Sequence, residues 1–345
     1  SLHPLAAPLW RNGENVVFED GQVRKSAGTQ KVATALDTKP VTGIIDTLTD
    51  NLPNLVWGDF DALYRYNRDD GVTLERDGYD AGDFLVAFQE GAFQEDAFQY
   101  ARGRTPTLWS MDNWGEWVIA TDGVNTPQID KMDGSGAADL TGSPPAYAQI
   151  VVRIGNYIVF FNTDMGGNFA QWCNTDDVED YVNGAAGFLP VRDLSSEIIA
   201  AERLGAAVGC YSANEMVVFQ YIGPPYYFGF SKALSGIGAV GKACVVEQGA
   251  RHYGVHRQGF WVCDGASYQY ISPPLLREWC EVNIDWSNGG KIAGFLNEGR
   301  TMIEWGVPIV GGTGNNDTTI RFNYEKATWT FRSYGITAGL AKRIW

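Results

Sequence analysis

Residues 150–164 read IVVRIGNYIVFFNTD, and residues 197–219 read EIIAAERLGAAVGCYSANEMVVF. Each stretch consists of an apolar run, a tight turn that contains Gly or Asn, and a second apolar run. Two apolar runs joined by such a turn predict a β-hairpin. Between the two stretches lie residues 169–194, FAQWCNTDDVEDYVNGAAGFLPVRDL. The centre of the chain therefore predicts two hairpins separated by an aromatic and partly acidic segment.

The hairpin pattern recurs along the whole chain. Its second apolar run begins at six positions, which are Leu55, Val118, Ile158, Val217, Trp261 and Met302. Three of the five intervals between these positions are about 40 to 44 residues, and the two longer ones each contain an insertion. A repeat of about 40 residues with about four strands is the period of a propeller blade. We therefore predict an all-β fold, a β-propeller of five to seven blades that is closed by terminal strands.

The domain organisation follows from this repeat. We predict an N-terminal arm at residues 1–14 and a single propeller domain at residues 15–345, with an early hairpin that turns at Asp20-Gly21 and a late strand at residues 327–333. Joining the two ends of the chain would close the ring and remove free sheet edges. Residues 176–193 form a second short insertion, with room for one short helix.

The first insertion spans residues 77–104 and contains AFQEGAFQEDAFQ. Its phenylalanines recur every five residues, a step that matches neither a helix face nor a strand face. Two interpretations stay open: a loop whose aromatic rings pack on a neighbouring surface of the same chain, or an arm that docks into an adjacent subunit. The apolar residues that we select as candidate protein–protein contacts lie in the arm and in this insertion: Leu5, Trp10, Phe84, Phe88, Phe93, Phe98 and Tyr100.

The net charge of the chain is −15, from 41 acidic and 26 basic residues. No cluster of Lys and Arg of the kind that wraps nucleic acid is visible. The acidic balance either keeps the protein soluble or lets its surface repel DNA along a channel wall. The five cysteines are odd in number and widely spaced, which predicts small buried hydrophobic residues in a reduced chain. No signal-peptide pattern and no membrane-spanning run is visible, so we expect a cytosolic product without membrane insertion.

Few residues are candidates for catalysis or metal binding. His252 and His256 would share one side of an extended strand, and Cys263 or Asp264 could complete a metal site, but a structural pair is the default interpretation. The acidic pairs at residues 176–177 and 179–180 fit turn carboxylates better than glycosidase carboxylates. The tryptophans that lie in or beside strand runs are predicted core residues: Trp57, Trp109, Trp117, Trp172, Trp261 and Trp329. We predict no enzyme activity, catalytic residue, cofactor or metal.

Two stretches resemble a known group of proteins. Residues 11–32, RNGENVVFEDGQVRKSAGTQKV, resemble the opening of many tailed-phage virion proteins, through Asn15, Asp20, Gly21, Val23, Arg24 and Gly28, with Ala27 where Pro is usual. The central stretch resembles the same group, with Cys173 where Ser is usual and Glu197 where Gly often stands. Its matching residues are Gln171, Trp172, Cys173, Asp177, Tyr181, Phe188, Leu189, Pro190, Ile199, Ala200, Leu204, Gly205 and residues 217–219. The group is the β-propeller tail proteins of phages, similar to tail-hub and nozzle components of short-tailed phages.

The resemblance implies a structural virion protein, made in the bacterial cytoplasm and located in the tail. It implies a homo-oligomeric ring, commonly a hexamer, that surrounds the DNA exit channel, holds other tail proteins and lets viral DNA pass without sequence-specific binding. We hypothesise that an acidic lumen speeds this passage, so changing lumen carboxylates to Lys should slow DNA ejection. Two alternatives stay open: a receptor- or glycan-binding propeller at the tail tip, and a propeller glycosidase.

Overall fold

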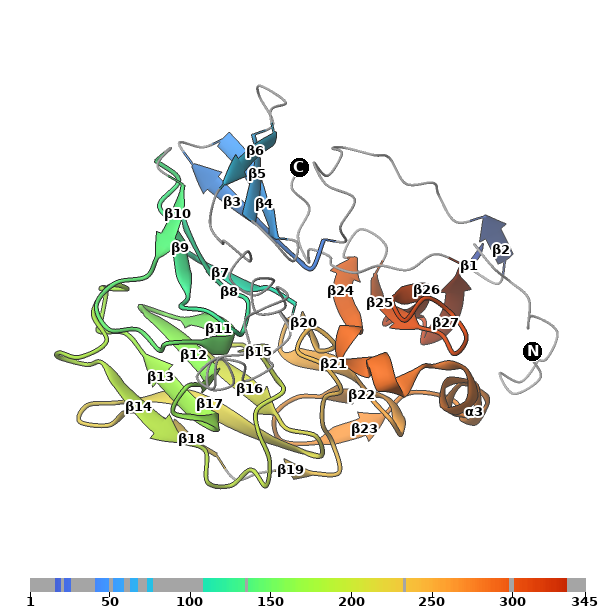
Figure 1. The fold of residues 1–345 in the computed structure, drawn as a ribbon. Helices are drawn as coiled ribbons and strands as arrows, with labels where there is room; N and C mark the ends of the chain where they lie inside the picture. Colours follow the sequence, from blue (N-terminus) through green and yellow to red (C-terminus); the bar gives the residue numbers. More distant parts are fainter. Residues whose placement is uncertain are drawn as a thin grey trace, which may run out of the picture.

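The computed structural model describes residues 16–19, 22–25, 41–49, 52–58, 63–67, 73–76, 108–133, 136–231, 234–297 and 301–333. Within these residues, six antiparallel sheets are arranged as a β-propeller (Figure 1), and a seventh sheet of two strands lies outside the blades. The predicted all-β propeller is therefore confirmed, and the number of blades is six. The arm at residues 1–14 and the insertion at residues 77–104 lie outside the described residues.

The first three blades are four-stranded meanders. Blade 1 consists of β3 (Gly43–Thr49), β4 (Leu52–Gly58), β5 (Leu63–Asn67) and β6 (Thr73–Arg76). Blade 2 consists of β7 (Ser110–Trp114), β8 (Trp117–Thr121), β9 (Gln128–Asp130) and β10 (Ala137–Asp139). Blade 3 consists of β11 (Ala148–Ile154), β12 (Tyr157–Thr163), β13 (Gly166–Trp172) and β14 (Gly187–Pro190).

The other three blades follow in sequence order. Blade 4 consists of β15 (Ala200–Leu204), β16 (Ala207–Tyr211), β17 (Glu215–Gly223) and β18 (Tyr227–Phe230), and the short β19 (Leu234–Ser235) also pairs with β17. Blade 5 consists of β20 (Val246–Gln248), β21 (Arg251–His256), β22 (Gly259–Cys263) and β23 (Tyr268–Tyr270). Blade 6 consists of β24 (Ala293–Asn297), β25 (Met302–Pro308), β26 (Asn316–Asn323) and β27 (Thr328–Arg332).

The two ends of the described chain meet at blade 6. The predicted early hairpin forms from β1 (Val16–Glu19) and β2 (Gln22–Lys25), and the predicted late strand is β27. β1 contacts β27, although β1 and β2 remain a separate two-stranded sheet (Figure 1). The contact between the chain ends is therefore one of packing, and each of the six blades is completed by its own four consecutive strands.

The central hairpins form as their sequence predicts. Ile154 pairs with Tyr157 across a two-residue turn, in which Gly155 has a φ of +56°. Leu204 pairs with Ala207 in the same way, and Gly205 has a φ of +63°. Two-residue turns with positive φ match the twist of an antiparallel pair, which is why Gly is favoured there. The local sequence therefore sets the register of the innermost hairpins of blades 3 and 4.

The predicted repeat identifies one hairpin per blade, but it does not always identify the same strand. The runs at residues 55–57, 118–120, 158–160 and 302–304 lie in the second strands of their blades. The runs at residues 217–219 and 261–263 lie in β17 and β22, which are third strands. The second and third strands of a blade both carry buried apolar residues, as β16 and β17 do, so an apolar run alone does not distinguish neighbouring strands. The number of repeats was still correct because each run belongs to a different blade.

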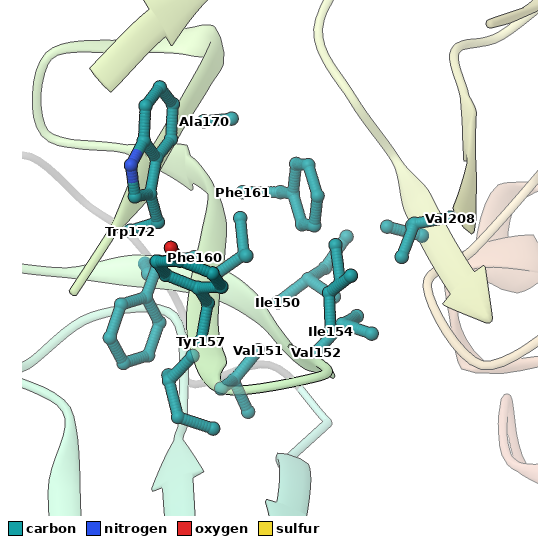
Figure 2. Packing of buried hydrophobic residues seen from close by; sticks show 14 of the residues in the cluster. Ile150, Val151, Val152, Ile154, Tyr157, Phe160, Phe161, Ala170, Trp172 and Val208 are labelled. Carbon is teal, nitrogen blue, oxygen red and sulfur yellow. The ribbon is translucent and has the colours of Figure 1, made fainter. Parts of the chain in front are cut away.

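The hydrophobic core lies between the blades. One cluster joins blades 2, 3 and 4 through fully buried side chains such as Ile158, Phe160, Phe161 and Phe219. Figure 2 shows Phe160 and Phe161 of blade 3 and Val208 of blade 4 within this cluster. A second cluster joins one face of blade 4 to blades 5 and 6. Burying a side chain of this size stabilises the fold by about 1.5–3 kcal/mol. Trp57, Trp109, Trp172 and Trp261 are buried and Trp117 and Trp329 are half-buried, which confirms their predicted place in the packing.

Two helical segments occur in the described residues, and neither lies where the sequence suggested one. Residues 174–186 form turns that lead into β14, so the helix considered for residues 176–193 is absent there. Instead, α3 (Pro274–Asn283) and η3 (Trp286–Lys291) occupy the connection between blades 5 and 6 (Figure 1). The sequence contains the start signal of α3, because Pro273-Pro274 places proline at the first helical turn. Its buried stripe of Leu276 and Cys280 is too short to be seen as a helical period.

Candidate functional site

The innermost strands of the blades surround a central channel with a volume of about 180 Å³. Its wall includes residues from β3, β7, β11, β15 and β24, together with the segment just before β20. Each blade therefore contributes backbone or side chains to one shared space, as the propeller architecture requires. Most of the wall is apolar or backbone, and its charged residues are Asp112, Glu202, Arg203 and Lys242.

Asp112 is the most enclosed of these charged residues. One carboxylate oxygen accepts a hydrogen bond from the backbone N–H of Arg153 at 2.7 Å, and the other accepts one from the backbone N–H of Asn113 at 2.8 Å. The guanidinium of Arg203 lies 3.4 Å away. Burial raises the pKa of Asp112, while Arg203 and the two N–H groups oppose that increase. The contacts tie blades 2, 3 and 4 together at the channel, so Asp112 is a structural link.

Burial shifts the pKa values of Glu202 and Lys242 in opposite directions, toward neutral pH. Burial raises the pKa of Glu202 to about 7, and burial lowers the pKa of Lys242 to about 7. Lys242 donates a hydrogen bond to the backbone oxygen of Gln149 at 3.1 Å, and Glu202 accepts one from the N–H of Arg203 at 3.2 Å. An acid and a base that titrate near neutral pH can exchange protons with water, which is the requirement of general acid–base chemistry. However, ligand pockets usually have volumes of about 300–1,000 Å³, so the channel leaves little room for a substrate.

A hollow of about 310 Å³ lies between the first hairpin turns of blades 3 and 4. Arg153 and Arg203 line it together with the backbone of Gly155 and of residues 205–207. Arg153 donates a hydrogen bond to the oxygen of Gly155 at 2.9 Å, and its guanidinium lies 5.3 Å from the centre of a Trp114 ring. Arg203 also lines the central channel. This hollow is thus an arginine-lined surface next to the channel in an otherwise acidic protein.

The candidate metal ligands have structural roles instead. His252 is fully buried between Tyr211 and the backbone oxygen of Arg203, and His256 lies 3.1 Å from the backbone oxygen of Ala213. Within the described ranges, no group of three or more His, Cys, Asp or Glu side chains is placed to hold a metal ion. Asp264 accepts hydrogen bonds from the N–H groups of residues 266 and 267, as expected in a turn.

The acidic pairs of residues 176–180 also serve local structure. Asp180 accepts hydrogen bonds from the N–H groups of Val182 and Asn183, which lower its pKa. Glu179 pairs with Lys131 at 2.7 Å and accepts a hydrogen bond from Thr141 at 2.8 Å. These contacts favour the interpretation of turn carboxylates over that of paired catalytic acids.

The residues selected from the sequence as protein–protein contacts are not among those that the structure places. Leu5, Trp10, Phe84, Phe88, Phe93, Phe98 and Tyr100 all lie outside the described residues. The charged residues of the channel were not identified from the sequence. They lie in separate runs, such as SMDNW and AAERL, and only the ring of blades brings them together. A charge within the first strand of a blade is the one signal that could have identified Asp112, Glu202 and Arg203.

The five cysteines are all buried and free, as predicted. In the described part of the chain, no helix has the length and apolar content needed to cross a membrane.

No family model and no curated protein matches the sequence. Among solved structures, the chain is similar to the computationally designed Ika8 protein, with a TM-score of 0.47, 10% identity, and coverage of 90% of this chain and 93% of that one. It is also similar to the extracellular domain of BT4673 from B. thetaiotaomicron in two structures, with TM-scores of 0.45 and 0.46 and 15% identity in both. The similarity covers 81% and 88% of this chain but only 33% and 42% of those chains.

Proposed function

We propose that this chain is a non-catalytic structural component of a bacteriophage tail, of the hub, nozzle or adaptor type. The observation that carries the proposal is the role of the residues that resemble phage tail propellers. Trp172 is buried and donates a hydrogen bond from Nε1 to the backbone oxygen of Ala185 at 2.7 Å. The thiol of Cys173 accepts a hydrogen bond from the N–H of Ile158 at 3.1 Å, and the Tyr181 ring lies 5.9 Å from that of Phe160. The motif thus anchors the outer edge of blade 3, a role suited to a scaffold.

The size of the channel decides where DNA would pass. A volume of about 180 Å³ cannot hold a duplex, whose major groove alone is about 12 Å wide. In the proposed assembly, DNA therefore passes through a lumen between subunits of a ring, and the propeller is a solid block in the wall of that ring. The net charge of −15 would keep such a wall from binding the phosphate backbone.

The hairpin of β17 and β18 offers a surface for contact with a neighbouring subunit. Residues 220–229, QYIGPPYYFG, contain no charged side chain in a strongly acidic protein. Tyr221, Ile222 and Tyr226 are 48%, 52% and 74% exposed. Protein–protein interfaces are enriched in aromatic residues and depleted of charge at their centre. We therefore assign this hairpin to the ring contact, in addition to the contacts selected from the sequence.

Immunogold labelling tests the proposal. Antibodies raised against the purified chain should label the tails of intact virions of the phage that encodes it, and virions without the protein should lack a complete tail. Virions with normal tails that carry no label would refute the structural role. For the hairpin, Tyr226→Lys should impair ring formation measured by native mass spectrometry, while Val310→Lys, at a site 60% exposed, should leave it intact.

A further inference from the structure

A groove of about 630 Å³ lies between α3 and blade 5. One wall is the face of α3 that carries Pro274, Arg277, Glu278 and Glu281, which recur at the i, i+3, i+4 and i+7 spacing of one helix face. The other walls are the turn between β21 and β22, the ring of Tyr270 and the ring of Trp286. The volume falls in the range of small-molecule binding sites.

The aromatic walls of the groove are held in place. Trp286 is half-buried and packs against the core cluster of blades 4 to 6. It begins η3, whose N-cap Asp285 accepts hydrogen bonds from the N–H of Ser287 at 3.1 Å and from Nδ2 of Asn288 at 2.7 Å. One side of the indole is therefore packed on protein, and the groove borders the remainder. A ring fixed in this way can stack on a ligand with little loss of conformational entropy.

The polar side chains that line the groove are also held in place by neighbouring residues. The hydroxyl of Tyr270 lies 3.1 Å from the oxygen of Gly236 and 3.0 Å from Oε1 of Gln258. The aliphatic part of Arg277 lies against Gly259, where an added Cβ would come within 3.0 Å of Cγ. The side chains of Tyr270 and Arg277 are thus positioned before any ligand arrives, as a binding site requires.

The chemistry of the walls indicates the class of ligand. Arg257 and Arg277 offset Glu278 and Glu281, so the groove has no net charge and does not suit a polyanion. A purely apolar ligand would remove water from these charges without replacing its hydrogen bonds. A sugar has an apolar face of C–H groups that fits an aromatic ring, and neighbouring hydroxyl groups that pair with planar guanidinium, amide and carboxylate groups. We propose that this groove binds an uncharged oligosaccharide, with Trp286 as the stacking platform.

This inference does not depend on a role in a phage tail. It concerns a single site, because the exposed aromatic residues elsewhere in the described chain, Phe188, Tyr221 and Tyr226, belong to blades 3 and 4 and not to equivalent positions around the ring. We therefore expect one glycan-binding site in this groove, and not a site that repeats from blade to blade.

The full chain can be tested by affinity electrophoresis in native gels that contain dextran, mannan, galactan or poly-glutamate, and on an array of neutral bacterial glycans. We expect at least one neutral glycan to bind, with an affinity that varies little between 50 mM and 500 mM salt. Trp286→Ala should weaken binding roughly tenfold or more. Trp114→Ala, which removes another half-buried indole in blade 2, should have no effect.

A second variant covers the case in which Trp286→Ala fails to fold. Glu281→Lys changes an exposed helix residue, keeps the core intact, and should also weaken binding because it removes a carboxylate that accepts hydrogen bonds from sugar hydroxyl groups. Failure of all the neutral glycans to bind, or binding that both groove variants leave unchanged, would overturn the proposal. Salt-sensitive retention by poly-glutamate alone would overturn it as well, in favour of an acidic partner.

Discussion

At the scale of single residues, His252 shows how burial fixes a protonation state. Its Nε2 lies 2.5 Å from the backbone oxygen of Arg203, and its Nδ1 lies 2.8 Å from the hydroxyl of Tyr211. A carbonyl oxygen can only accept, so Nε2 carries the proton and Nδ1 accepts from the tyrosine. Both nitrogen atoms of the neutral ring are thereby satisfied. Burial lowers the pKa of His252 to about 4, so the ring stays neutral over most of the pH range.

This pKa predicts a loss of stability in acid. The unfolded chain protonates His252 near pH 6.5, while the folded chain resists protonation until about pH 4. Stability is therefore unaffected above pH 6.5 and decreases as the pH falls toward 4, by up to about 3 kcal/mol. His252→Gln should cost roughly 1–3 kcal/mol at pH 7 through lost hydrogen bonds, but should remove this part of the pH dependence. Urea unfolding at pH 7 and pH 4.5 measures both effects, and an unchanged pH slope in the variant would contradict the prediction.

The cysteines give a second prediction at this scale. Burial raises the pKa of Cys173 and of Cys280 to about 12, and all five thiols are buried. Thiolate is the reactive form, so the native protein should leave its thiols unmodified by Ellman's reagent at pH 8 over an hour. All five should react after unfolding in guanidinium chloride. Rapid reaction of one thiol in the native protein would show that its site opens.

At the scale of secondary-structure elements, a pairing of Gly with Trp recurs in three blades. Gly187 pairs with Trp172, Gly254 with Trp261 and Gly294 with Trp305 on neighbouring strands. Each indole lies over its glycine and donates a hydrogen bond from Nε1 to a backbone oxygen, of Ala185, Gly238 and Cys244 respectively. The glycine leaves space for a flat ring within the sheet, and the hydrogen bond fixes that ring to an adjoining segment.

Filling that space should be costly. A Cβ at Gly254 would come within 2.6 Å of Cη2 of Trp261. Trp261 is fully buried, so its ring has nowhere to move. Gly254→Ala should therefore lower the free energy of unfolding by about 1–3 kcal/mol. Gly290→Ala is the matched control, because no atom lies within 4 Å of the added Cβ and no positive φ is required there. Chemical denaturation compares the two variants, and equal stabilities would refute the argument.

Blade 6 contains a buried ion cluster. Oε2 of Glu304 lies 3.6 Å from Nε of Arg321 and 3.8 Å from Nη1 of Arg332, while Oε1 accepts a hydrogen bond from Asn297 at 2.9 Å. Removing one charge from a buried cluster leaves the others without full compensation. Glu304→Gln should thus destabilise the protein by about 3–5 kcal/mol. The same change at Glu179, whose ion pair with Lys131 is partly exposed, should cost less than about 1 kcal/mol. Similar losses in thermal unfolding of both variants would contradict this difference.

These elements also show how far the sequence could be interpreted. The hairpins at Gly155 and Gly205 were predictable because turn chemistry and apolar alternation act over neighbouring residues. The position of each run within its blade was not predictable, because an apolar run alone does not indicate whether it forms the second strand or, as at residues 217–219 and 261–263, the third strand. The Gly–Trp pairs and the Glu304 cluster depend on cross-strand register, which a single sequence does not display.

At the scale of the whole molecule, the central channel brings together residues that are far apart in the chain. Asp112, Glu202 and Lys242 come from three blades, and this set becomes visible only once the ring closes. The groove beside α3 is more local, because its lining residues lie between positions 257 and 286. The blade repeat was nevertheless sufficient to predict the ring itself, because each repeat is a complete local unit that packs on its neighbours.

The distribution of the core predicts how the ring opens. Blade 4 contributes one face to the cluster shared with blades 2 and 3, and its other face to the cluster shared with blades 5 and 6. Blade 1 joins blade 2 through small clusters, one centred on Val56 and Val118 and one on Leu63 and Trp109. Local stability follows the extent of buried apolar contact. Blades 3 to 6 should therefore form the most stable unit, and blade 1 should open first.

Hydrogen exchange followed by mass spectrometry measures this order. At pH 7, amides of β12, β16, β22 and β25 should exchange only through global unfolding, whereas those of β3 and β4 should exchange through a smaller opening with a lower free energy. Val56→Ala should speed exchange in blade 1 and leave β22 and β25 unchanged, because its contacts lie within blades 1 and 2. Val255→Ala, in the cluster of blades 4 to 6, should instead speed exchange across that whole cluster. Equal protection in all six blades, or a response to Val56→Ala that spreads around the ring, would mean that the propeller opens as one cooperative unit.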